Sequence, residues 1–249
     1  MTIGTLRFYT LPPISESYPF IILNANRPEI GLRYLRSHRP KSVIIDSGVE
    51  IFRDPSVREY PFYHLSGLAR LYHSIKRLAK ETWVTIPDYP DDYTPTALWI
   101  SNEITNIERT HENILEALSK HSDVNWLIPI QGHNEKPQSI IKAVKLLERD
   151  GILSTHDFYA VANLCTSKKP TTIESTLHLA RWLLPRKRLH SFGISLTAAL
   201  HLNGVIDSFD SMAWTFPRGR GRASCRNQQE RVQYFHEYIT KLPPLEVSL

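Results

Sequence analysis

Short apolar runs rich in β-forming residues alternate along the chain with amphipathic stretches of helical period, and this alternation most constrains the fold. Seven runs qualify as strands, and they lie at residues 20–25, 42–47, 83–88, 125–131, 158–164, 189–195 and 206–212. The runs are apolar almost throughout, as strands buried on both faces are. The amphipathic stretches between them are clearest at residues 66–80, 103–120, 137–151 and 171–184. This order predicts a parallel sheet joined by right-handed helical crossovers.

Seven or eight strand–helix units in 249 residues favour a TIM (β/α)8 barrel, a single α/β domain, over a doubly wound sheet. The eighth strand is either residues 5–10 or a piece inside residues 213–224. No G-x-G-x-x-G follows the first strand and no P-loop pattern occurs, which weakens a nucleotide-binding alternative. We expect residues 1–249 to form one domain, with residues 1–19 as an N-terminal extension and residues 227–249 as a last helix and tail.

Helix boundaries follow from local signals. The 137–151 stretch has Pro137 near its start and Gly151 just past its end, the usual asymmetry of helix termini. The 103–120 stretch begins after Ser101 or Asn102, and either side chain is suited to cap the first turn.

Composition narrows the class of protein. The net charge of +5 and the isoelectric point of about 9.2 permit a polyanionic partner without requiring one. Two cysteines are too few for a disulfide framework or a four-cysteine zinc cluster. The N-terminus lacks the features of a signal peptide, and no apolar run has the length of a membrane span. We therefore expect a cytoplasmic protein without membrane contact.

In a TIM barrel the chemistry gathers at the C-terminal ends of the strands. Those ends carry Asp46, Asp88, Gln131 with Gly132, residues 163–165, Gly193 and Asp210. A single Asp after a strand is most often a helix cap or a turn residue. Three on different strands of one barrel would crowd together, and crowded carboxylates are tolerated mainly where their shifted pKa values serve a site.

Other side chains near these strand ends suit ligand binding. Gln131 and Asn163 each donate and accept hydrogen bonds, so either could read the edge of a nucleobase or simply hold a loop. Cys165 and Cys225, with a histidine such as His190 or His236, leave a rebuilt metal site as a minor alternative.

The last strand candidate carries Asp207 and Asp210 and runs into a tract of arginines. The four arginines, spaced in part by glycines, are Arg218, Arg220, Arg222 and Arg226. They either neutralise an acidic strand tip or clamp a polyanion beside a reactive carboxylate. Because neighbouring side chains of a strand alternate between faces, a spacing of three turns Asp207 away from the face of Asp210. We therefore expect Asp207 to be structural.

With these residues in place, the order of motifs resembles the tRNA-guanine transglycosylase superfamily, most closely its branch that inserts 7-deazaguanines into DNA. Six motifs of this family have counterparts here in the same order. They are Asp-Ser-Gly-Gly-Phe-Gln, a strand-end Asp, Val-Gln-Gly, Tyr-Ala-Ile-Gly-Gly-Leu, a His-containing strand, and Ile-Asp-x-Phe-Asp with Pro-Thr-Arg-x-x-Arg. The counterparts are 46-DSGVEIF-52, 84-VTIPDYPDD-92, 128-IPIQGH-133, 159-YAVANLC-165, 190-HSFGIS-195 and 206-IDSFDSMAWTFPRGRGR-222.

The resemblance implies a role for each matching position. It makes Asp210 the nucleophile and Asp46 the proton-transfer residue beside the leaving and entering base. It assigns recognition of the base to Asp88, to Gln131 with Gly132, and to the backbone around Asn163 and Leu164. The arginines 218, 220, 222 and 226 would then hold flanking phosphates, a contact that salt weakens.

Three departures qualify these assignments. Val49 replaces the second glycine of the first motif, and Ala162 and Asn163 replace the Gly-Gly pair. The family's Cys-x-Cys-x-x-Cys and His zinc site is missing, since only Cys225 follows the nucleophile strand. No added RNA-binding domain follows. These losses favour DNA over tRNA, and they predict a protein without a required cofactor, in which zinc is an alternative only through a rebuilt site.

The chemistry that the resemblance implies is base exchange through a covalent glycosyl-aspartate, in which guanine in a nucleic acid is replaced by a free 7-deazaguanine or guanine base. The target nucleotide would have to leave its stack to reach a barrel mouth. Three alternatives stay open: a tRNA-guanine transglycosylase proper, a catalytically silent nucleic-acid-binding paralogue, and a hydrolytic glycosidase or nucleosidase. A homodimer is also possible.

Overall fold

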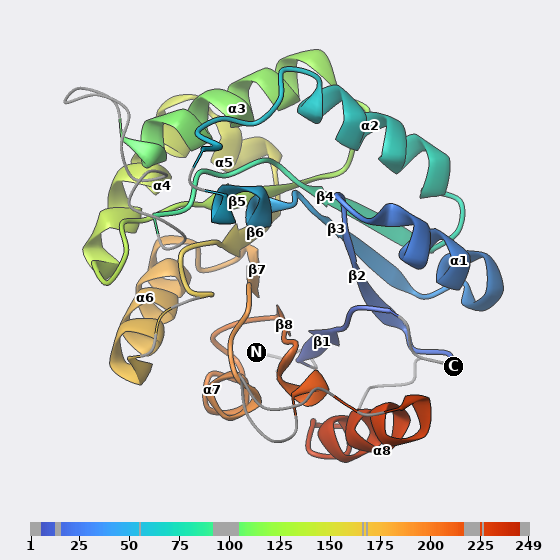
Figure 1. Ribbon diagram of the computed structural model, residues 1–249. Helices are drawn as coiled ribbons and strands as arrows, with labels where there is room; N and C mark the ends of the chain where they lie inside the picture. The colour runs from blue at the N-terminus through green and yellow to red at the C-terminus, as the bar shows by residue number, and fades with distance from the viewer. Residues whose placement is uncertain are drawn as a thin grey trace.

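A computed structural model describes residues 6–12, 16–54, 56–91, 105–165, 167, 169–216, 225 and 227–244. Within these ranges eight parallel strands alternate with helices and form a nearly closed barrel (Figure 1). The strands are β1 Arg7–Tyr9, β2 Phe20–Asn24, β3 Ser42–Asp46, β4 Glu81–Thr85, β5 Trp126–Ile130, β6 Phe158–Val161, β7 Arg188–Ser191 and β8 Ser208–Asp210. The predicted single-domain TIM barrel is thus confirmed.

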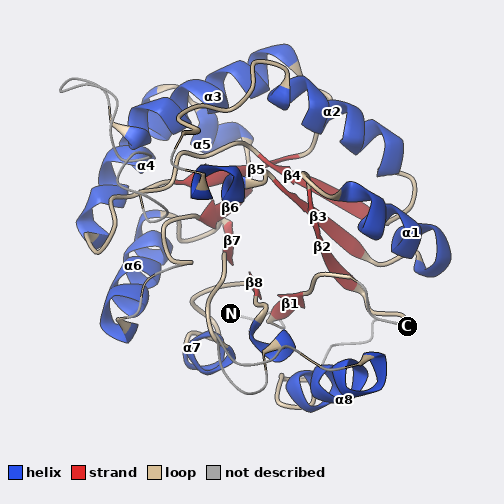
Figure 2. Ribbon diagram, in the orientation of Figure 1, coloured by secondary structure: helices blue, strands red, loops and turns tan. Residues whose placement is uncertain are grey.

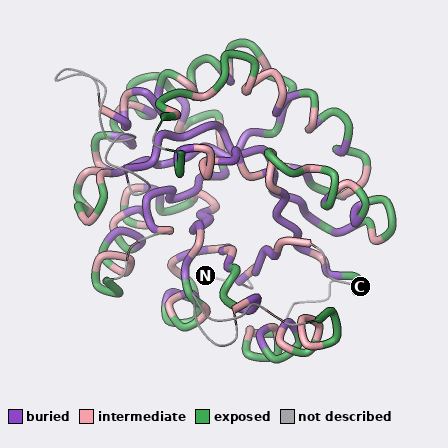
Figure 3. Tube along the Cα trace, viewed as in Figure 1, coloured by how far each residue is buried: buried purple, intermediate pink, exposed green. Residues whose placement is uncertain are grey.

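The helices lie outside the strands and cover the ring (Figure 2). The α-helices are α1 Pro28–His38, α2 His64–Ile75, α3 Asn106–Lys120, α4 Ile140–Arg149, α5 Ile152–Thr155, α6 Pro170–Leu183, α7 Leu196–His201 and α8 Gln228–Ile239. Three 3-10 turns, η1 Val49–Arg53, η2 Pro137–Ser139 and η3 Ala213–Thr215, follow strand ends or open a helix. The strands are buried along most of their length, whereas the helices expose their outer faces (Figure 3). None of the helices in the described ranges is long and apolar enough to span a bilayer.

The barrel closes between β1 and β2 through a single bridge. Thr10, just past β1, donates its N–H to the Phe20 carbonyl at 3.2 Å and accepts the N–H of Ile22 at 2.9 Å. Side chains reinforce this seam, because the Tyr9 hydroxyl donates to Ser42 Oγ on β3 at 2.8 Å. All other neighbouring strands are joined by regular ladders.

The N-terminal segment contributes to the barrel itself, so its assignment as an extension is wrong for residues 7–9. β1 pairs with β8 in parallel register from Arg7 opposite Ser208 to Tyr9 opposite Asp210. Of the two alternatives for the eighth strand, residues 5–10 are therefore the correct one. The cause is burial, since Phe8 and Tyr9 are almost fully excluded from solvent and pack on aromatic neighbours.

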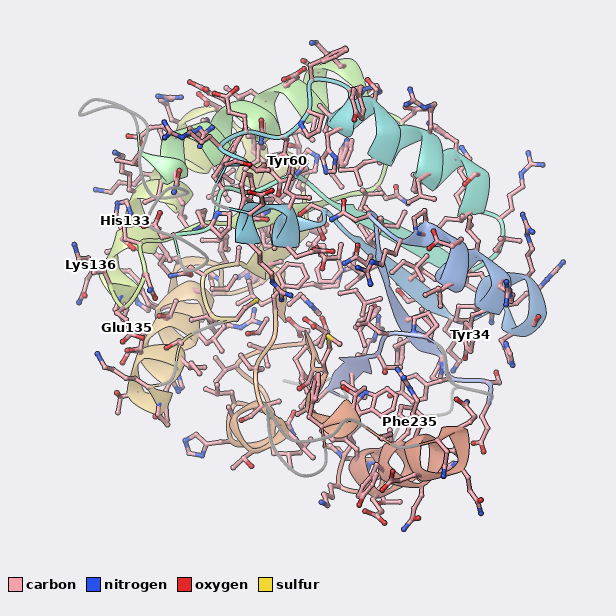
Figure 4. All side chains as sticks on the ribbon, viewed as in Figure 1. Tyr34, Tyr60, His133, Glu135, Lys136 and Phe235 are labelled. Atoms are coloured by element: carbon pink, nitrogen blue, oxygen red, sulfur yellow. The ribbon has the colours of Figure 1, made fainter. Side chains whose placement is uncertain are left out.

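The last helix, α8, packs on the β1 side of the barrel, as expected for a helix within residues 227–249. Phe235 lies on its barrel-facing side (Figure 4) and meets the rings of Tyr18 and Trp214 at centroid separations of 5.2 Å. Asn227 caps the helix by accepting the N–H of Glu230 at 2.8 Å.

Helix α3 begins later than the sequence pattern indicates. Its N-cap is Thr105, in a capping box with Glu108, while Ser101 and Asn102 lie outside the described residues. The Thr-x-x-Glu spacing is the stronger N-terminal signal, because it satisfies two orphan backbone donors at once. Helix α4 behaves closer to expectation: Pro137 opens the preceding η2, and Gly151 takes a positive φ of 71° after the helix.

Charged side chains close the end of the barrel opposite the mouth. Glu81, at the start of β4, forms ion pairs with Arg7 of β1 and Arg188 of β7, with nitrogen–oxygen distances of 3.8 Å and 3.9 Å. The Arg188 guanidinium lies 4.6 Å from the ring centroids of both Trp83 and Phe158. Because these strands are not neighbours, the contacts cross the interior and show which face of each strand points inward.

Candidate active site at the barrel mouth

Strand alternation and register identify the side chains that face the mouth. Pro129, Ala160 and His190 are successive partners across β5, β6 and β7, and His190 faces the interior because its ring meets that of Tyr9. Two residues further along each strand, the same face carries Gln131 after β5 and Asp210 after Ser208 on β8. On β3, Ser42 contacts Tyr9 and therefore faces inward, so Asp46 does as well. Asp46, Gln131 and Asp210 thus belong to one inward-facing layer.

Asp46 is a carboxyl group whose pKa is raised from the usual Asp value to about 7. Burial is the largest cause, and the negative charges of Glu50 and Asp210 add to it. The N–H of Gly48, which the Asp46 Oδ1 accepts at 3.1 Å, opposes the shift. Around neutral pH this group therefore exchanges a proton readily, which is the requirement for a general acid and base. The influence of Asp210 also shows that the two carboxylates lie within electrostatic reach.

Gly48 holds the turn after Asp46. Its φ of 86° is in the left-handed region, and a Cβ there would lie 2.6 Å from the Asn26 amide nitrogen. The replacement of the second family glycine by Val49 leaves this turn in place, since Val49 starts η1 with ordinary helical geometry available to it.

Within the described residues, one carboxylate oxygen of Asp210 is held by hydrogen bonds and the other is not. Oδ1 accepts the Gly193 N–H at 3.0 Å and lies 3.3 Å from His190 Nε2. His190 is fully buried, and its Nδ1 lies 2.9 Å from Ser208 Oγ. The tautomer protonated on Nε2 satisfies both contacts, because the Ser208 hydroxyl then donates to Nδ1. No described residue donates a hydrogen bond to Oδ2, and the Asp210 side chain is 17% exposed.

Gly193 combines a backbone and a packing requirement beside Asp210. Its φ is 66°, and a Cβ at this position would lie 2.9 Å from Cys165 Sγ and 3.1 Å from the Cys165 Cα. Cys165 therefore packs on the loop that supplies the N–H to Asp210.

We expect Gly193→Ala to destabilise the protein by two additive terms. The left-handed backbone costs a Cβ residue about 1–2 kcal/mol, and crowding against Cys165 costs about 1–3 kcal/mol more. Gly151→Ala is the matched control, because Gly151 has φ 71° but no atom within 4 Å of a built Cβ. Urea unfolding of both variants measures the difference, and equal losses would show that Cys165 does not restrict this loop.

Gln131 is only 1% exposed and has an incomplete set of partners. Its Nε2 donates to the neighbouring Gly132 carbonyl at 2.9 Å, whereas its Oε1 has no hydrogen-bond partner among the described residues. A buried acceptor left open costs free energy. Its place in the inward-facing layer fits the predicted role of reading a polar ligand.

Asn163 and Gly132 face the other way. The Asn163 Nδ2 donates to the His133 carbonyl at 3.3 Å, on the side of the β5–η2 loop where His133 lies (Figure 4). Gly132 abuts Ile140 of α4, and Leu164 is part of the hydrophobic core. Of the two alternatives for the Asn163 side chain, the structure shows the loop hydrogen bond, since alternation from Ala160 puts Ala162, and not Asn163, on the inner face. A role for the backbone here stays a prediction.

Asp88 lies in the loop beyond β4, three residues past the strand end. It is buried, and its carbonyl accepts the Tyr60 hydroxyl at 3.0 Å. Burial, with the negative charges of Asp88 and Asp46, raises the pKa of Tyr60 well above its usual value. Tyr60 therefore connects the two predicted acidic positions and stays protonated.

Sequence reasoning missed Glu50, a further carboxylate of the mouth. The Asn24 side chain, at the end of β2, donates to its Oε1, and its charge raises the pKa of Asp46. The signal available was its place four residues after Asp46 in a turn that winds back over the strand end. His190 was considered only as a metal ligand, although its contact with Asp210 is its main feature here.

The remaining predicted positions separate from the mouth or fall outside the described residues. Asp207 pairs with Arg181 of α6 at 2.7 Å and accepts the Leu189 N–H at 2.8 Å, which confirms its outward, structural placement. Arg218, Arg220, Arg222 and Arg226 lie outside the described residues.

The minor metal-site alternative gains no support from the arrangement of its members. Cys225 Sγ approaches the Thr215 carbonyl at 3.7 Å, and His236 on α8 pairs with Glu16 at 2.7 Å. His190, by contrast, is inside the barrel. In the part of the chain that the structure describes, no three His, Cys, Asp or Glu side chains gather as a metal site.

Comparison with known proteins adds no family to this arrangement. No family model matches the chain, and no curated protein matches it.

Proposed function

We propose that this protein is a base-exchange transglycosylase that replaces guanine in a nucleic acid, with DNA favoured over tRNA, by a free 7-deazaguanine. One observation carries the proposal: the mouth holds a buried carboxyl with a pKa of about 7, Asp46, within electrostatic reach of Asp210, whose Oδ2 accepts no hydrogen bond from a described residue. The order of sequence motifs supports the same assignment. We place the activity in the cytoplasm, where nucleic acid and free base meet.

The proposed reaction proceeds by two displacements at the sugar carbon that carries the base. Asp210 Oδ2 attacks this carbon, the bond to the base nitrogen breaks, and protonated Asp46 gives its proton to the departing base. The incoming base then gives a proton to the Asp46 carboxylate and displaces Asp210. Each step forms one bond to the sugar carbon and breaks another, so the configuration is retained and no redox cofactor or ATP enters the balance.

The neighbouring side chains suit these steps. The Gly193 N–H and His190 fix the orientation of the Asp210 carboxylate through Oδ1, which leaves Oδ2 as the oxygen proposed to attack. Gln131 offers an unused acceptor to the base's polar edge. Asp88, buried beside Tyr60, is the other candidate for base recognition.

The proposal is tested by incubating the protein with a single-stranded DNA, a hairpin DNA or tRNA, together with labelled guanine or 7-cyano-7-deazaguanine. Nucleoside analysis of the polymer should find the label in DNA at low and moderate salt. Release of guanine without incorporation would assign a hydrolase instead, and binding without either reaction would assign a silent paralogue. Incorporation into tRNA alone would show that the substrate is tRNA and not DNA, while the base-exchange chemistry would be kept.

His190 is proposed as a positioning residue for the nucleophile, and two substitutions separate its contacts. His190→Gln keeps a donor near the position of Nε2, whereas His190→Asn keeps one only near Nδ1. Because misplacing a reacting group costs on the order of 100-fold, we expect His190→Asn to lower kcat by about 10- to 100-fold with KM unchanged, and His190→Gln to retain more activity. If both variants lose the same amount of activity per folded protein, the His190 side chain contributes packing and not positioning of Asp210.

A further inference from the structure

Two aromatic side chains stand in solvent at the rim of the mouth. Phe62 is 97% exposed and Tyr63 is 57% exposed, and their rings meet edge to face with centroids 5.4 Å apart. They occupy the two central positions of a turn in which the His64 N–H donates to the Pro61 carbonyl at 2.8 Å. Exposing a large apolar ring forgoes about 1.5–3 kcal/mol of burial free energy, so two adjacent exposed rings at this place are a candidate surface for a ligand.

The turn is anchored on both sides to the candidate site. Before it, the Tyr60 hydroxyl donates to the Asp88 carbonyl. After it, His64 Nε2 donates to the Ser47 carbonyl, next to Asp46, at 2.7 Å. The rings of Tyr60 and His64 stack at a centroid distance of 4.6 Å, which ties the two anchors together. The exposed tip is thus held at a fixed place beside both acidic positions.

A separate aromatic cluster stabilises this arrangement. Phe52 meets Tyr60 at 4.9 Å, Tyr60 meets Tyr89 at 5.4 Å, and the Arg109 guanidinium lies 3.5 Å from the Tyr89 ring centroid. Phe52 and Tyr89 form a small hydrophobic core apart from that of the barrel. Tyr60 lies on the inner side of the loop below α2 and α3 (Figure 4). A rigid support lowers the entropy that the exposed rings lose on binding.

The charges that follow the tip are all positive. Residues 60–80 contain four Lys or Arg and no Asp or Glu. Arg70, in the middle of α2, is exposed and forms no ion pair with an acidic side chain of the described residues, whereas Lys76 and Arg77 follow the C-terminal end of the helix, on the side of the β4 start and away from the mouth. An aromatic tip with an exposed arginine behind it is complementary to a polyanion that presents flat rings.

We propose that Phe62 and Tyr63 form a stacking surface for the nucleobases that flank the target nucleotide, with Arg70 of α2 meeting an adjacent phosphate. The proposal rests on the proposed function for its choice of a nucleic acid as the ligand. It adds the place at which the nucleic-acid strand would leave the barrel mouth. Bases offer ring faces of the size of Phe62, and stacking of this kind tolerates any sequence. A protein partner would need a wider apolar surface than two rings.

The test is equilibrium binding of a fluorescently labelled single-stranded DNA of about 12 nucleotides at low salt. We expect Phe62→Ala to weaken binding by about 5- to 100-fold, the range found when a stacked base loses its aromatic partner. Phe62→Trp should restore binding to within a few-fold, and Phe62→Leu, which is apolar but cannot stack, should behave like Phe62→Ala. Trp182→Ala is the matched control, because Trp182 is 74% exposed on α6, away from the mouth.

The outcomes separate this inference from the proposed function. If the protein exchanges bases and Phe62→Ala binds DNA with the affinity of the wild type, the stacking surface is rejected and the proposed function is kept. If the protein exchanges no base and Phe62→Ala binds DNA more weakly than the wild type, the stacking surface is supported and the proposed function is rejected. If Phe62→Ala dissociates a dimer in sedimentation while DNA binding is unchanged, the tip is a contact between protein chains and the inference fails.

Discussion

Asp210→Asn is expected to abolish base exchange, lowering the rate by about 10⁴-fold or more, as removal of a nucleophile does in other covalent mechanisms. The substitution keeps the shape of the side chain and an oxygen that can accept from Gly193, but it removes the charge that attacks the sugar. Two measurements apply: incorporation of labelled base, and a covalent protein–DNA adduct that survives denaturing electrophoresis. Wild type should form the adduct and Asp210→Asn should not.

Asp207→Asn is the control for this prediction, because Asp207 lies on the same chain segment but pairs with Arg181 outside the barrel. We expect it to lose about 1–3 kcal/mol of stability from the weakened charge-assisted hydrogen bonds, while the folded protein still forms the adduct. Adduct formation in Asp210→Asn would instead place the nucleophile elsewhere.

Asp46→Asn is expected to remove a pH dependence of folding that the wild type shows between about pH 4 and pH 7. The folded-state pKa of about 7 lies above the ordinary value of 3.8. Protonation therefore favours the folded state, and this contribution is complete below about pH 4 and lost as pH rises toward 7. Each pKa unit corresponds to about 1.4 kcal/mol, so the change is on the order of a few kcal/mol. Urea unfolding at pH 5 and pH 8 should show Asp46→Asn gaining stability relative to wild type at the higher pH.

The same group should shape the pH dependence of catalysis. As the acid for the departing base, Asp46 must be protonated, so the rate of the first displacement falls above about pH 7. Asp46→Asn should lower exchange by about 10²- to 10⁴-fold and remove this limb of the profile. A rate that stays constant from pH 6 to pH 9 in the wild type would contradict the assignment, whatever the stability data show.

The barrel was predictable because its strands are apolar on both faces, and few other folds bury seven or eight such runs. The inward placement of Asp46 and Asp210 followed from the same pattern, since each ends a strand whose interior residues are spaced by two. For the Asn163 side chain both a ligand role and a loop role stayed open, because the end of its strand could not be located to one residue, and an error of one residue reverses the face.

Other features depend on tertiary contacts that no local pattern contains. The His190 contact with Asp210 joins residues twenty positions apart, and it arises only because β7 and β8 are neighbours in register. The Tyr60 contact with Asp88 depends on how the loop after β3 folds across the next strand end. The capping box of Thr105 and Glu108, by contrast, was readable and was passed over in favour of Ser101 and Asn102.

The β1–β2 seam has a mechanical consequence for the mouth. Going round the ring from Asp210 to Asp46 the short way, one passes from β8 to β1, across the seam, and then from β2 to β3. The shorter arc between the two carboxylates is therefore joined at the seam by two backbone hydrogen bonds, while regular ladders brace the longer arc. The Tyr9–Ser42 hydrogen bond also spans this joint from β1 to β3, so a few contacts at the seam set the separation of the strands that carry the two carboxylates along the shorter arc.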